Sequence, residues 1–190
     1  MVRRAGRATL ADGTALVWSV ADGRRGRRWR AVTTRDGILT ATLLLEVGVD
    51  GRPARLELAT AAGLLTLHPE GAGSLHGNAV TADGVRHLAF AWSDEHELAI
   101  DGVPIGSAVT ARRLADAAAV GEGRTVSVVA VAADLSVREE TLDFVRLDDA
   151  TWRIEGDGEG ESRTVAIDER GLLVWAAGAG EWPLERETPG

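Results

Sequence analysis

Short apolar runs, many of them alternating with polar residues, follow one another along almost the whole chain. Alternation with a period of two puts apolar side chains on one face of a strand, so each run predicts a half-buried β-strand. The pattern therefore predicts about a dozen strands. The runs are 14–20, 29–34, 38–49, 55–60, 64–68, 74–80, 85–92, 97–100, 125–137, 140–148, 151–156, 162–168 and 172–177.

Asp-Gly pairs separate many of these runs. Tight β-hairpin turns need positive φ angles, which Asp tolerates and Gly adopts freely. We therefore expect most strands to pair with their sequence neighbours. A positive φ is expected at the glycines of four such pairs, Asp36-Gly37, Asp50-Gly51, Asp83-Gly84 and Asp101-Gly102.

One segment departs from the alternation. SAVTARRLADAAAV, residues 107–120, is rich in alanine and has Val109, Leu114 and Ala118 at helical spacing. It predicts a short helix near 107–120, ended by the glycines at 121 and 123. Farther on, GDGEGES at 156–162 predicts an acidic, glycine-rich loop.

This number of sequential strands exceeds what one flat sheet accommodates, and twist makes a large antiparallel sheet curl. We expect an all-β fold with one domain over residues 1–190. We expect this domain to consist of a single large curved antiparallel sheet and the one short helix. The sheet should form an incomplete barrel, that is, a half-barrel or roll. The concave face of such a sheet would form an apolar cavity, the usual shape of a small-ligand site.

Composition excludes several classes of function. The chain of 190 residues has no cysteine, which excludes disulfides and thiolate metal sites. Its net charge of −8 opposes sequence-independent nucleic-acid binding, so no nucleic-acid partner is expected. The first residues form no signal peptide and no stretch reaches transmembrane length, which predicts a cytoplasmic protein. The composition does not indicate whether the protein is a monomer or an oligomer.

The stretch RRGRRWR, residues 24–30, concentrates five arginines in this acidic chain. On the strand that follows, Trp29 should point to one face while Arg28 and Arg30 point to the other. Guanidinium groups suit phosphate, sulfate or carboxylate, so this rim could hold an anionic headgroup. The alternative is that the arginines form ordinary cross-strand ion pairs, with Glu46, Glu57 or Asp36 as partners.

Aromatic residues and histidines give weaker signals. Almost all of the six tryptophans lie on predicted strands. We expect most of them to belong to the core, and the alternative is that two or three line a pocket. Each should need a partner for its indole N–H. His68, His76 and His87 fall on three consecutive strands, but their spacing matches no metal signature. No G-x-S-x-G nucleophile motif occurs. We therefore expect no metal, no cofactor and no catalytic residue.

Pro104, the triplet at 112–114 and the run of Asp168, Gly171, Leu172 and Val174 before a terminal aromatic residue share a spacing with a known family. With the Trp29-Arg30 strand upstream, the chain resembles the bacterial glycolipid-binding family. The resemblance implies a fold like that of bacterial lipoprotein carriers, a curved incomplete barrel around a hydrophobic cavity. It also implies an amphiphilic or glycolipid-like ligand.

The sequence thus predicts a non-catalytic protein that binds an amphiphilic small molecule or lipid in the concave cavity. Two alternatives stay open: a hydrolase-like enzyme that uses His87 and an acid in the same cavity, and a protein-interaction module that presents a sheet edge. The candidate ligand-binding residues are Arg28, Trp29, Arg30, His87, Trp92 and Arg113.

Overall fold

The computed structural model describes residues 2–10, 12–70, 73–156 and 162–189. In this part of the chain it contains sixteen strands and one helix, which confirms the all-β fold. The predicted loop at 156–162 lies almost entirely outside the described residues. The strands are β1 (Val2–Thr9), β2 (Ala15–Gly23), β3 (Gly26–Arg35), β4 (Ile38–Val47), β5 (Pro53–Thr60), β6 (Gly63–Glu70), β7 (Ser74–Thr81), β8 (Gly84–Ala91), β9 (His96–Ile100), β10 (Gly123–Val131), β11 (Val137–Arg146), β12 (Thr151–Gly156), β13 (Arg163–Ile167), β14 (Leu173–Ala176), β15 (Gly180–Glu181) and β16 (Leu184–Pro189).

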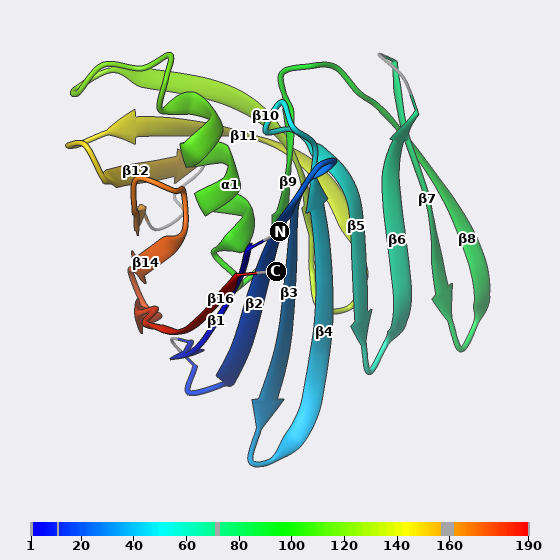
Figure 1. Ribbon diagram of the computed structural model, residues 1–190. Helices are drawn as coiled ribbons and strands as arrows, with labels where there is room; N and C mark the ends of the chain where they lie inside the picture. Colours follow the sequence, from blue (N-terminus) through cyan, green and yellow to red (C-terminus); the bar gives the residue numbers. More distant parts are fainter. Residues whose placement is uncertain (1, 11, 71–72, 157–161, 190) are drawn as a thin grey trace.

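The described strands divide between two sheets. One sheet has nine strands in the order β16-β1-β2-β3-β4-β5-β6-β7-β8, and the other has seven in the order β15-β14-β13-β12-β11-β10-β9. The nine-stranded sheet is antiparallel throughout and forms the long curved wall in Figure 1. The curl expected of a large twisted sheet is therefore present, with a second sheet beside it.

Helix α1 (Ile105–Leu114) joins the parallel strands β9 and β10. A parallel pair needs a crossover connection, usually helical, which explains the helix in an otherwise antiparallel fold. The helix begins two residues before the predicted segment and ends at Leu114 rather than near 120. After its end, the guanidinium of Arg146 donates hydrogen bonds to the carbonyls of Ala115 and Ala118, 2.9 and 2.8 Å away. These bonds give carbonyls beyond the last turn a partner outside the helix.

A continuous apolar core fills the middle of the half-barrel. Trp18, on β2, packs against Trp29 and Trp182, with ring centroids 5.9 and 6.4 Å apart. Five of the six tryptophans are buried, so the expectation that most belong to the core is confirmed. The expectation of an indole partner is wrong for four of them, since the buried Nε1 atoms of Trp18, Trp29, Trp152 and Trp182 have no hydrogen-bond partner among the described residues.

The turns follow the Asp-Gly signals. Gly37, Gly51, Gly84 and Gly102 all have positive φ angles, as predicted. Three of these turns connect antiparallel neighbours, whereas Gly102 lies in the connection from β9 to helix α1. No helix among the described residues combines the length and apolar character that a membrane crossing would require.

Candidate functional site

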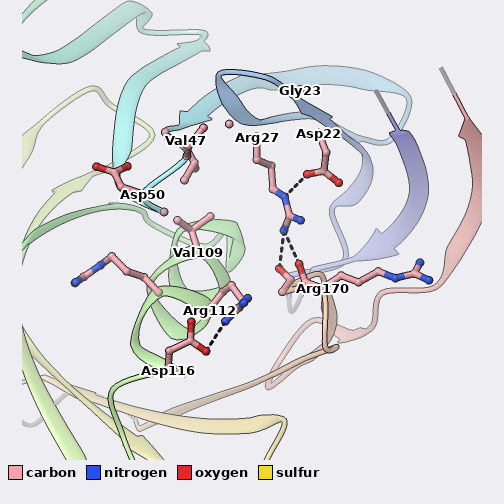
Figure 2. Close-up of a pocket in the computed structure, with 15 residues that line it drawn as sticks. Asp22, Gly23, Arg27, Val47, Asp50, Val109, Arg112, Asp116 and Arg170 are labelled. Atoms are coloured by element: carbon pink, nitrogen blue, oxygen red, sulfur yellow. Dashed lines mark hydrogen bonds and ion pairs between the residues drawn. The ribbon is translucent and has the colours of Figure 1, made fainter.

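A cavity of about 430 Å³ lies where helix α1 meets one end of the nine-stranded sheet (Figure 2). Its walls come from the turns after β2 and β4, the helix, and the turn between β13 and β14. We call it the arginine pocket because four arginines line it, together with three valines, three aspartates and several turn glycines. Its principal side chains are Arg27, Arg112, Arg113, Arg170, Val47, Val49, Val109, Asp22, Asp50 and Asp116.

Glycines let the walls of this pocket approach one another. A Cβ on Gly26 would lie 2.0 Å from the carbonyl oxygen of Val47, so the start of β3 and the end of β4 can meet this closely only with glycine there. A Cβ on Gly171 would lie 2.5 Å from the side chain of Arg112. Gly171 thus leaves the space in which the stem of Arg112 rests.

Arg27 belongs to a closed network of ion pairs and hydrogen bonds. The carboxylate of Asp22 accepts hydrogen bonds from both Arg27 and Arg4. The carboxylate of Glu187 accepts bonds from both Arg4 and Arg170. The backbone carbonyl of Arg170 accepts a bond from Arg27, which closes the network. Partial burial acts to raise the pKa of Asp22, but hydrogen bonds and charge from Arg27 and Arg4 outweigh it and hold that pKa below its usual value. The network therefore fixes an ionised carboxylate at the pocket wall.

Arg113 pairs with the buried carboxylate of Glu97 on β9. Glu97 is only 1% exposed, and its Oε2 has no hydrogen-bond partner among the described residues. Burial raises the pKa of Glu97, although Arg113 partly opposes this shift. Within the described part of the chain, only Nε of Arg113 is engaged, so its two terminal nitrogens keep their donors for a ligand.

Among the four arginines of the pocket, Arg112 has the longest described ion pair. Its side chain is 42% exposed, and its described ion pair is with Asp116, at 3.4 Å, whose own side chain is 87% exposed. Exposed pairs of this kind contribute little and exchange readily with solvent or ligand. Arg112 therefore lines the pocket on the same helix as Val109, which lies one turn earlier (Figure 2). Arg113, the next residue of the helix, lines the pocket as well.

The arginine stretch divides between two faces of β3. Trp29 is buried in the core, while Arg28 and Arg30 lie on the outer face of the sheet, as the alternation predicts. Arg28 pairs with Glu46 at 2.7 Å, which confirms the ion-pair alternative for that residue. Arg28 and Arg30 line a separate outer hollow and do not reach the arginine pocket.

The other predicted residues are dispersed. Arg113 lines the arginine pocket, but His87 and Trp92 line neither this pocket nor the outer hollow. His87 is exposed on β8, and its Nδ1 lies 2.6 Å from the Oδ1 of Asn78. The ring of Trp92 packs against the ring of His96, with centroids 5.3 Å apart. Among the described residues, no group of three or more potential ligands could hold a metal ion.

A second hollow of about 430 Å³ opens at the opposite end of β3 and β4. Leu10, Leu58 and Val103 contribute apolar surface, and threonine hydroxyls and Arg35 with Asp12 contribute polar groups. Between the two hollows the concave face is filled by buried side chains such as Trp29 and Leu45. Among the described residues, packed side chains therefore separate the arginine pocket from the second hollow.

Sequence reasoning did not single out Arg27, Arg112 or Arg170 as binding residues. Arg27 could have been found, because alternation from Trp29 puts it on the inner face of β3. Arg112 belongs to the Arg-Arg-Leu triplet already noted, next to Arg113. Arg170 carries no local signal, since its place in the pocket depends on a turn of the other sheet.

Comparison with known proteins bears on the fold. No family model and no curated protein matches the chain. Among solved structures, a DUF1089 family protein from Pseudomonas aeruginosa is similar, with a TM-score of 0.57 and 20% sequence identity over 93% of this chain and 86% of that chain. At this identity the likeness concerns the all-β architecture.

Proposed function

We propose that the protein is a non-catalytic binding protein for a small amphiphilic molecule with an anionic group, held in the arginine pocket. The observation that carries this proposal is that Arg112 and Arg113 line one cavity together with the apolar side chains of Val47, Val49 and Val109. Guanidinium groups bind phosphate, sulfate or carboxylate in charge-assisted bonds. The valines supply the apolar surface that an amphiphile needs beside its head.

Titration calorimetry with octyl phosphate, butyl phosphate and octyl glucoside tests this proposal. We expect octyl phosphate to bind more tightly than butyl phosphate, because the longer chain buries more apolar surface. Octyl glucoside, with an uncharged head, should bind more weakly than octyl phosphate. Equal affinity for the two phosphates would contradict the amphiphilic part of the proposal, and equal affinity for phosphate and glucoside would contradict the anionic part.

Arg112→Gln is the decisive variant, because Arg112 lies in the pocket and its described ion pair is a weak one. Loss of a charge-assisted contact of about 1.5–3 kcal/mol should weaken octyl phosphate binding at least tenfold. Arg124→Gln is the matched control, since the Arg124 side chain is 44% exposed and lies outside the pocket. Unchanged affinity in Arg112→Gln would refute the site.

A glycolipid-like ligand would use the second hollow instead. There, the hydroxyls of Thr33 and Thr40 lie 2.8 Å apart beside apolar side chains, and hydroxyl groups suit the hydroxyls of a sugar. Backbone amide shifts at Thr33 and Thr60 on titration with octyl glucoside would support this alternative. The hydrolase alternative gains no support, because His87 lies on the outer face of β8 and lines neither end cavity.

A further inference from the structure

The outer face of the nine-stranded sheet carries a hollow of about 330 Å³, on the opposite side of β3 from the core. It is lined by Arg3 from β1, Arg28 and Arg30 from β3, and the small residues Ser19 and Ala21 from β2 between them. Strand β2 therefore forms a low floor, with arginines rising on both sides. We call this the outer hollow.

Strand register explains how the arginines gather here. Arg3 and Arg28 both pair with Ala21 from opposite sides, and Arg30 pairs with Ser19. Two inter-strand spacings separate Arg3 from Arg28 by about 9.5 Å of backbone, and the methyl group of Ala21 leaves room for both side chains to lean inward. Arg3, Arg28 and Arg30 therefore border one small space above Ser19 and Ala21.

The charges of the outer hollow are poorly balanced. Arg28 pairs with Glu46, but neither Arg3 nor Arg30 has an ion pair or a side-chain hydrogen bond among the described residues. Like charges on neighbouring strands destabilise a sheet. In a chain of net charge −8, the outer hollow is therefore a local concentration of positive charge.

We propose that the outer hollow is a second ligand site, separate from the arginine pocket, and that it binds a small soluble molecule through a phosphate or diphosphate group. Guanidinium groups match phosphate oxygens in paired hydrogen bonds. The net charge of −8 favours a small anion over an extended anionic surface. A small anion in the hollow interacts mainly with the charges within a Debye length, about 8 Å, which here are the arginines. An extended anionic surface would also be repelled by the negative charge of the rest of the protein.

Inorganic pyrophosphate is the probe, followed by calorimetry and by backbone amide NMR. We expect binding to shift the amide signals of Ser19 and Ala21, and Arg3→Gln with Arg30→Gln to weaken affinity at least tenfold. Arg55→Gln, an exposed arginine elsewhere on the sheet and outside the hollow, is the matched control and should change affinity less than twofold. Arg112→Gln should leave the shifts at Ser19 and Ala21 unchanged, which separates the outer hollow from the arginine pocket.

Ala21→Glu gives an independent test. A carboxylate at position 21 would lie in register between Arg3 and Arg28 and would neutralise them from within. We expect the variant to melt at a higher temperature than the wild type while losing pyrophosphate binding, an outcome that misfolding cannot produce. The proposal would be overturned if pyrophosphate still bound to Ala21→Glu or to the variant with Arg3→Gln and Arg30→Gln. It would also be overturned if the amide shifts were confined to the arginine pocket. Binding to phosphatidic acid vesicles without binding to pyrophosphate would overturn it as well.

Discussion

The Nη1 of Arg27 donates a hydrogen bond to the carbonyl oxygen of Arg170, 2.8 Å away and 143 positions later in the chain. The Nε of Arg27 donates to Asp22 at 2.7 Å (Figure 2). One side chain thus joins the hairpin between β2 and β3 to a turn of the other sheet. This bond directly connects two walls of the arginine pocket.

Replacement of Arg27 by methionine should destabilise the protein by about 1.5–3 kcal/mol, because the side chain is only 22% exposed and its bonds involve charged groups. Urea denaturation measures the effect. Arg28→Met is the control, since the neighbouring pair with Glu46 is exposed and should contribute less than about 1 kcal/mol. Equal effects of the two substitutions would contradict a special role for Arg27.

Glu97 should make stability depend on pH. Burial raises its pKa in the folded protein above the ordinary value of 4.5, so the folded state keeps this proton at a pH where the unfolded chain has lost it. Stability should therefore fall as pH rises from about 4.5 through the folded pKa, by at most about 1.4 kcal/mol per pH unit. Urea unfolding of the wild type and of Glu97→Gln between pH 4 and 8 measures the difference, and parallel curves would contradict it.

Two turn glycines should differ in their sensitivity to alanine. Gly84 has φ +123° and an open surrounding, so Gly84→Ala should cost about 1–3 kcal/mol through backbone strain alone. Gly63 has φ +139°, and a Cβ there would also lie 2.0 Å from the carbonyl oxygen of Val80. Gly63→Ala should therefore lower the thermal midpoint further than Gly84→Ala. The reverse order would contradict the described packing.

The loss of stability on replacing a tryptophan by alanine should depend on how deeply the side chain is buried. Trp182 is 2% exposed and packs on Trp18, so Trp182→Ala should destabilise by about 3–5 kcal/mol. Trp175 is 39% exposed, and Trp175→Ala should change stability by about 0.5 kcal/mol or less. Far-ultraviolet circular dichroism should follow unfolding, because both substitutions alter fluorescence. A small effect at Trp182 would place it outside the core.

The sequence by itself determined the strand content and the sites of most turns. Alternation placed Trp29 inward and Arg28 and Arg30 outward on β3, and Asp-Gly pairs marked the hairpins after β3, β4 and β7. These features depend on residues a few positions apart, so local periodicity and backbone preference are enough to predict them.

Only the tertiary structure decided strands β1 and β16, at one end of the nine-stranded sheet, and the two arginine sites. Strand β1 has no apolar alternation to detect, because Arg4 points inward and is buried by partners 18 and 183 positions away, Asp22 and Glu187. The arginine pocket likewise depends on how helix α1 crosses between the parallel strands β9 and β10. Contacts between such distant residues arise from the order and packing of the strands, which local sequence patterns do not encode.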